Sequence, residues 1–89
     1  MQMEEVIERI RKAVPQASEI EVDGADCDFT AIVLCESFAG QSLVKRQQQV
    51  LAQFSDVLAA GDLHALTVKA YTPSEWQAKQ GQNLTQLSL

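Results

Sequence analysis

The chain has 89 residues, of which 46% are hydrophobic and 21% charged, so it can form one domain with a single core, and its composition argues against disorder. The net charge of −5 counts against a protein that binds nucleic acid mainly through phosphate contacts. The charged residues within 1–42 are mainly acidic, with nine Asp or Glu and three Lys or Arg. Residues 43–89 carry three Asp or Glu and four Lys or Arg. Any anion-facing surface is therefore expected from the second half.

Export and membrane insertion are not indicated by the sequence. No run approaches the roughly 20 apolar residues that span a bilayer, and the N-terminus "MQMEEVIERIRKAV" is acidic and amphipathic, unlike a signal peptide. We therefore expect a cytoplasmic protein without a membrane contact, in which Cys27 and Cys35 are free thiols.

The first half of the chain predicts a helix followed by a hairpin. Apolar residues recur at helical spacing up to Pro15, which ends the helix. "SEIEVDG" (18–24) alternates apolar and acidic residues and predicts a strand with an exposed acidic face, and "FTAIVLC" (29–35) predicts a second strand. The turn "DGADCD" between them predicts an antiparallel pair, with Cys27 at or beside its tip.

A long helix is predicted after the break "ESFAGQS", with Ser42 as its N-cap and Gly61 as its C-terminal stop. Its apolar stripe has one polar member, Gln47, and Lys45 and Arg46 are expected on the outer face. The stripe consists of Leu43, Val44, Gln47, Val50, Leu51, Phe54, Val57 and Leu58.

"HALTVKAY" (64–71) predicts a third strand, and "TPSE" supplies the Thr, Pro and Glu of a helix start. A short helix is expected through Trp76, ending at Gly81, before a flexible tail at residues 82–89. The predicted domain covers residues 1–81. Its order is α-β-β-α-β-α, an α+β fold in which the helices cover one face of a three-stranded sheet to bury their stripes.

Three residues attract attention for metal chemistry. His64, the only histidine, is either a strand-end residue satisfied by backbone or a metal ligand, and alone it cannot hold zinc in a closed site. Cys27 lies between Asp26 and Asp28, whose carboxylates oppose thiolate formation, although a soft metal could still deprotonate it. Cys35 ends an apolar strand and is interpreted as a core residue.

Gly40 followed by Lys45 and Arg46 at a helix start could hold a phosphate, but basic pairs on helices are usually solvated surface. Glutamines on the same face could equally meet a protein. No catalytic triad, phosphate-cradling loop, CxxC or paired-carboxylate motif is present. The residues alone indicate a binding module and not an enzyme.

"HALTVKAYTPSEW" together with "FAGQSLVKRQQQV" resembles the BolA family, most closely its small bacterial members with "KAYTPxEW". The resemblance covers roughly residues 4–80 and implies a type II KH-like fold, in agreement with the predicted order, and a role in the bacterial stress response.

The resemblance implies a monothiol glutaredoxin as partner and a 2Fe-2S cluster shared between the two proteins. On the glutaredoxin side the ligands are its cysteine and a glutathione thiol. The matching positions in this chain are His64 and Cys27. The expected function is iron-sulfur cluster trafficking or iron and redox sensing, and we expect the free protein to be a monomer or weak homodimer.

Nucleic-acid binding by a KH-like regulator is the alternative, with Gly40, Lys45 and Arg46 as the contact residues. The GxxG loop that clamps nucleic acid in KH domains is absent, because Leu43 stands where the second glycine would be, and Ala39 replaces the family's acidic residue in "FDG". Only weak DNA binding is expected.

Overall fold

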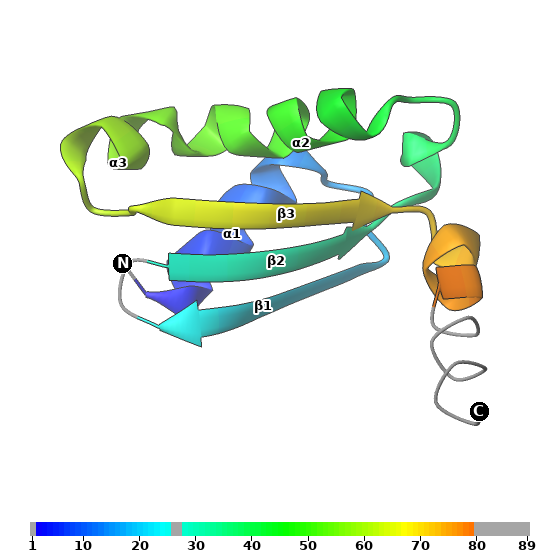
Figure 1. Ribbon diagram of the computed structural model, residues 1–89, viewed down its shortest axis with the longest axis horizontal. Helices are drawn as coiled ribbons and strands as arrows, with labels where there is room; N and C mark the ends of the chain where they lie inside the picture. The colour runs from blue at the N-terminus through cyan, green and yellow to red at the C-terminus, as the bar shows by residue number, and fades with distance from the viewer. Residues whose placement is uncertain (1, 26–27, 80–89) are drawn as a thin grey trace.

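The computed structural model describes residues 2–25 and 28–79. Its centre is a three-stranded sheet in the order β1-β2-β3 (Figure 1). Strand β1 (Glu19–Ala25) pairs antiparallel with β2 (Asp28–Leu34), and β2 pairs parallel with β3 (Ala65–Tyr71). The parallel pair brings the starts of β2 and β3 to the same end of the sheet, with Asp28 opposite Ala65.

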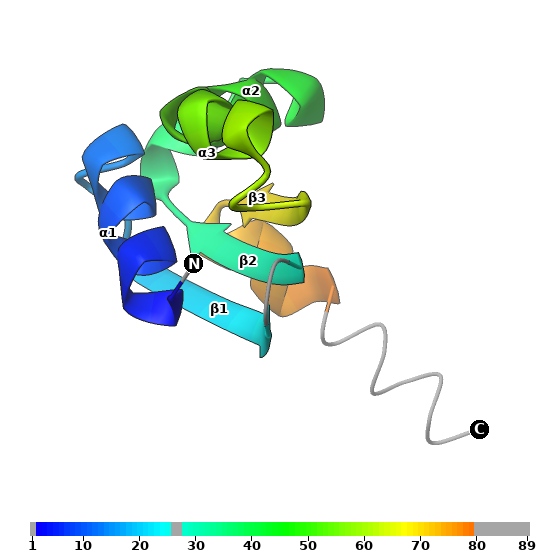
Figure 2. The same cartoon turned by 90° about the vertical axis from the view of Figure 1, so that its left-hand side faces the viewer.

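The helices α1 (Met3–Ala13), α2 (Leu43–Leu51) and α3 (Ser55–Ala60) cover one face of this sheet (Figure 2). Both long apolar stripes and the inward side chains of all three strands meet in a single core. The α+β fold class and the placement of the first two predicted helices on one sheet face are therefore confirmed. The buried core consists of Val6, Ile10, Val14, Phe29, Ala31, Val33, Cys35, Phe38, Val50, Phe54, Val57, Leu63, Val68 and Ala70.

The predicted long second helix is divided into two. A 3-10 turn, η2 (Ala52–Phe54), separates α2 from α3, and Phe54 leaves helical geometry with φ −120° and ψ 4° while its ring is fully buried. The prediction of a buried apolar stripe was wrong at its N-terminal end, because Leu43 and Val44 are 52% and 62% exposed. At this end α2 extends past the apolar core, so periodicity alone does not bury its first turn.

The N-cap of α2 and the C-terminal stop of α3 are the residues that the sequence predicted. The Ser42 hydroxyl accepts a hydrogen bond from the Lys45 amide at 3.2 Å, and Gly61 ends α3 with φ +85°. A positive φ at this position favours glycine. Residues 73–79 form the last described helix, which begins after Thr72 and lies at the end of β3, on the side of the sheet away from α1 (Figure 2).

The strands of the hairpin have the predicted lengths, but their pairing runs further into the predicted turn. Asp23 and Gly24, which belong to both the predicted strand and the predicted turn, pair with Thr30 and Phe29, and the ladder continues to Ala25 opposite Asp28. Gly24 has φ +122°, a backbone geometry that residues with a side chain rarely adopt, so this strand position favours glycine. The expected tip residue Cys27, the helix stop at Gly81 and the tail at residues 82–89 lie outside the described residues.

Candidate functional site

His64 stands at the entrance to β3. Gly61 ends α3, and the buried Leu63 anchors the connection through a hydrogen bond of 3.2 Å from its amide to the Val57 carbonyl. His64 follows as an exposed residue, and the strand begins at Ala65. The burial of Leu63 thus fixes the backbone on one side of the imidazole, while β3 fixes it on the other.

The end of the sheet at which His64 stands is also the end of the β1–β2 hairpin (Figure 1). Ala65 pairs with Asp28, and Asp28 pairs with Ala25. Three chain segments from separate parts of the sequence therefore meet beside His64. Cys27 directly precedes Asp28 but lies outside the described residues, so its role stays a prediction.

The ring of His64 is available to an external group. Within residues 2–25 and 28–79, the side-chain hydrogen bonds and ion pairs do not include it. The same part of the chain contains no group of three or more His, Cys, Asp or Glu side chains that could hold a metal ion. A neutral imidazole is a good ligand for iron or zinc, but a metal bound here needs further ligands from beyond these residues.

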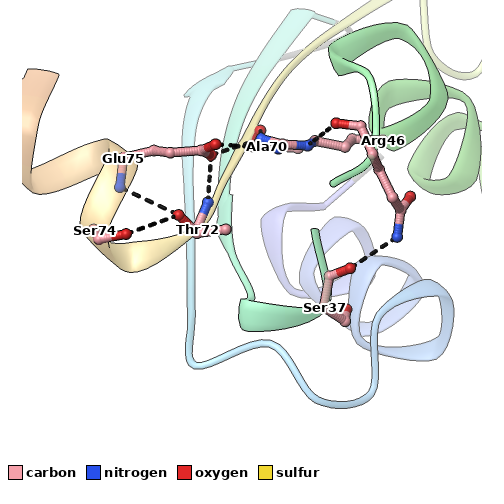
Figure 3. A network of polar contacts seen from close by, with 7 residues as sticks. Ser37, Arg46, Ala70, Thr72, Ser74 and Glu75 are labelled. Atoms are coloured by element: carbon pink, nitrogen blue, oxygen red, sulfur yellow. Dashed lines mark hydrogen bonds and ion pairs between the residues drawn. The ribbon is translucent and has the colours of Figure 1, made fainter. Parts of the chain in front are cut away.

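The opposite end of β3 holds a polar network around Arg46 (Figure 3). The Arg46 side chain is only 4% exposed, and its guanidinium donates to the carbonyls of Gln41 and Ala70, each at 3.1 Å. It also forms a two-pronged ion pair with Glu75, at 2.7 and 3.2 Å, and stands over the ring of Phe38 at 5.8 Å. This network joins α2, β3 and the last helix.

Glu75 also caps the last helix. Its carboxylate accepts a hydrogen bond from the Thr72 amide at 2.9 Å, and its own amide donates to the Thr72 hydroxyl at 3.2 Å. This reciprocal capping box is the one that "TPSE" predicted. The Arg46 hydrogen bonds, followed by that from Thr72, lower the pKa of Glu75 from 4.5 to about 2.

The prediction that Arg46 lies on the outer face of the second helix was wrong. The side chain turns inward because Glu75 supplies the countercharge and accepts two hydrogen bonds, and two backbone carbonyls accept two more. Of the three residues considered for nucleic acid, Gly40 and Lys45 are exposed, and Arg46 is not. The phosphate-binding surface considered as the alternative at this helix start therefore loses half of its basic pair.

Two further residues have structural roles at these sites. The interpretation of Cys35 as a core residue is confirmed, since it is 1% exposed, with its sulfur 3.0 Å from the Ser37 hydroxyl. Gln47, the polar member of the predicted stripe, donates to the Val68 carbonyl at 3.3 Å. Sequence reasoning missed that Arg46 and Gln47 both bind the edge of β3. The one signal in the sequence was Glu75, which was predicted as a capping residue and is also the acidic partner of Arg46.

A family model for BolA-like proteins matches residues 5–75. The chain belongs to the BolA family. It is 41% identical over 58 residues to the acid stress protein IbaG of Escherichia coli K12, covering 65% of this chain and 69% of that protein. It is 39% identical over 54 residues to the DNA-binding transcriptional regulator BolA of Vibrio cholerae, covering 61% of this chain and 50% of that protein.

Solved BolA structures share the fold. A BolA homologue from Coxiella burnetii superposes with a TM-score of 0.71 at 28% identity, covering 86% of this chain and 97% of that one. Membership of the BolA family and the α+β fold predicted from the sequence are thus both confirmed. No helix within the described ranges 2–25 and 28–79 is long and apolar enough to cross a membrane.

Proposed function

We propose that this BolA-family protein is the partner of a monothiol glutaredoxin and shares a bridging 2Fe-2S cluster with it. The observation that carries the proposal is the exposed imidazole of His64, held on fixed backbone at the end of the sheet beside the hairpin. An imidazole that stabilised only this chain would be expected to hydrogen-bond within it. That of His64 has no such bond to the described residues.

Cys27 is the second proposed ligand from this chain. It is bonded directly to Asp28, and consecutive Cα atoms are about 3.8 Å apart. Asp28 and Ala65 are strand partners, which places their Cα atoms about 4.8 Å apart, and His64 directly precedes Ala65. Cys27 is therefore the sequence neighbour of the residue whose strand partner directly follows His64.

The donor set fits half of a shared site. Imidazole nitrogen and thiolate sulfur both bind iron in 2Fe-2S centres, and imidazole in place of thiolate raises the reduction potential. The described residues lack a set of three ligands, so a second protein and glutathione complete the site in this proposal. The chain then acts in iron-sulfur cluster trafficking or in iron and redox sensing. It acts without catalysis of its own, in a cytoplasm that keeps both cysteines reduced.

Co-purification tests this proposal. The wild-type chain is expressed together with a monothiol glutaredoxin, purified anaerobically with glutathione, and examined by visible absorption and iron analysis. We expect an iron-containing heterodimer with the absorption of a 2Fe-2S cluster. Cys27→Ser should change the lifetime or spectrum of the cluster and leave the apo complex intact. Failure to isolate any complex, or a complex without iron after reconstitution, would contradict the proposal.

Nucleic-acid binding is the weaker candidate. Its support is the similarity to a DNA-binding regulator and the exposure of Gly40 and Lys45. Against it stand the net charge of −5 and the burial of Arg46. We expect duplex DNA to bind more weakly than about 10 μM at physiological salt. Lys45→Glu is the proper test variant, since changing Arg46 disrupts the interior network. A tight, sequence-selective complex with duplex DNA would make nucleic-acid binding the favoured function.

A further inference from the structure

The face of the sheet opposite α1 and α2 carries charges arranged by strand. On β1 the outward residues are Glu19, Glu21 and Asp23, all exposed. The register puts Ile32 of β2 beside Glu21 and puts Lys69 of β3 on the other side of Ile32. The next row is Asp23, Thr30 and Thr67. We call the outward side chains of these two rows, together with Glu19, the open face.

Part of the open face is hollowed. A depression of about 560 Å³ is lined by Glu21, Val22, Asp23, Thr30, Ile32 and Lys69. Beyond Lys69 on β3, Tyr71 meets Trp76 of the last helix, with ring centroids 5.8 Å apart. The floor is the half-buried Ile32, and the wall formed by β1 is acidic. Such a surface offers an apolar contact with an anionic border.

The acidic side chains of β1 have no ion-pair partner within the described residues. The ion pairs among residues 2–25 and 28–79 are Arg9–Asp56 and Arg46–Glu75, neither of which involves β1. Glu19 and Glu21 therefore remain free to bind an external cation. Lys69 lies two strands away from Glu21 in the same row. Polyanions such as nucleic acids and acidic membranes are disfavoured by this border.

We propose that the open face docks a basic amphipathic helix of a partner protein. Its spacing fits, because Glu19, Glu21 and Asp23 are two residues apart on one strand, about 6.6 Å per step. Residues four apart on a helix rise about 6 Å, so Lys or Arg at i, i+4 and i+8 can face all three carboxylates. Apolar residues on the adjacent side of that helix then cover Ile32.

A helix fits this face better than an extended peptide. The hydrogen bonds of a sheet lie in its plane, so a chain lying on the face cannot pair its backbone with the strands. A helix satisfies its own backbone groups. The distance from β1 to β3 is about 10 Å, close to the diameter of a helix with its side chains. The proposal does not depend on His64 or on a cluster, and its test uses neither.

The probe is a labelled peptide of about 16 residues, rich in Ala, with Lys at i, i+4, i+8 and i+12 and Leu along the adjacent side. A peptide with Glu in place of Lys is the control ligand. Fluorescence anisotropy measures affinity for the full chain, and amide chemical shifts show whether Thr30, Ile32 and Lys69 respond. We expect the Lys peptide to bind on the open face and the Glu peptide to bind at least about tenfold more weakly.

Charge reversal in matched pairs locates the site. Glu19→Lys with Glu21→Lys should weaken binding about tenfold, whereas Glu4→Lys with Glu8→Lys, an equal charge change on α1, should weaken it less than about threefold. Lys69→Glu should tighten binding more than Lys45→Glu, its match on α2. Equal responses within both pairs, shifts confined to other surfaces, or no binding of the Lys peptide would overturn the proposal.

Discussion

The polar groups at the two ends of strand β3 differ in whether they are bonded within the chain. At its carboxyl end, the Ala70 carbonyl, Arg46 and Glu75 form a network in which each charged group has a partner within the chain. At its amino end, His64 is exposed, and its ring has no hydrogen bond to the described residues. One strand thus joins a region whose polar groups hold the fold together to a region whose polar group is available to another molecule.

This contrast separates stability from function along a single element. Removing a partner from the Arg46 network leaves a desolvated charge or carbonyl inside the protein, which is costly. Removing an exposed ring leaves only water in its place. Substitutions at the two ends should therefore affect different measurements, and this difference can be tested with matched variants.

The largest effect on stability is expected at Arg46. Arg46→Met removes the guanidinium and leaves the Gln41 and Ala70 carbonyls without their donor, at a cost of about 1–3 kcal/mol for each group that remains unsatisfied. Denaturant unfolding measures the loss. Arg9→Met is the control, because the Arg9 side chain is 27% exposed and its pair with Asp56 lies in solvent. An equal loss in both variants would show that burial of Arg46 does not matter.

A smaller loss is expected in the hairpin that borders His64. Gly24→Ala must adopt φ +122° and would place a Cβ 2.3 Å from the Asp28 carbonyl oxygen, so the backbone has to move. Gly40→Ala, at φ +82°, has the same kind of strain but no atom within 4 Å. Such strain costs about 1–3 kcal/mol. Gly24→Ala should lose more unfolding free energy than Gly40→Ala. The reverse order would mean that the hairpin relaxes freely.

A still smaller effect is expected from acid, because Glu75 is 44% exposed. Its pKa falls from 4.5 to about 2 on folding, so ionised Glu75 stabilises the fold above about pH 4.5, and this contribution disappears as the pH falls toward about 2. Thermal unfolding across that range should show a shallower decline for Glu75→Gln than for the wild type. Asp56→Asn should flatten the decline less, because its partner Arg9 is more exposed. An unchanged slope for Glu75→Gln would contradict the network.

Much of the fold follows from local patterns. The stripe of the first helix, the alternation in "SEIEVDG", the Ser42 cap, the Gly61 stop and the Thr72–Glu75 box are each decided by residues within a few positions of one another. Propensity and capping act over that range, so the sequence alone predicts these features.

The interior position of Arg46 could not be predicted this way. It depends on Glu75, 29 residues later, and on a strand carbonyl that is adjacent only in the folded chain. The exposure of Leu43 and Val44 likewise depends on where the core ends, which periodicity does not state. The position of His64 at the start of a strand was predictable, whereas the proximity of Asp28 and Ala65 required the parallel pairing of β2 with β3.

The smallest stability effect and the largest functional effect should coincide at His64. Because His64 is exposed, His64→Ala should change the unfolding free energy by no more than about 0.5 kcal/mol. In complex with a monothiol glutaredoxin, the same variant should lose or alter the visible circular dichroism of the shared cluster. Asp62→Ala, an exposed neighbour in the same connection, is the control and should leave both readouts unchanged.

The role of His64 is tested most directly by the visible circular dichroism of the glutaredoxin complex assembled with His64→Ala, recorded beside the wild-type and Asp62→Ala complexes. We expect a changed or absent cluster spectrum for His64→Ala, from a chain that remains fully folded in the far ultraviolet. A spectrum identical to that of the wild type would show that His64 is not a ligand of the shared cluster.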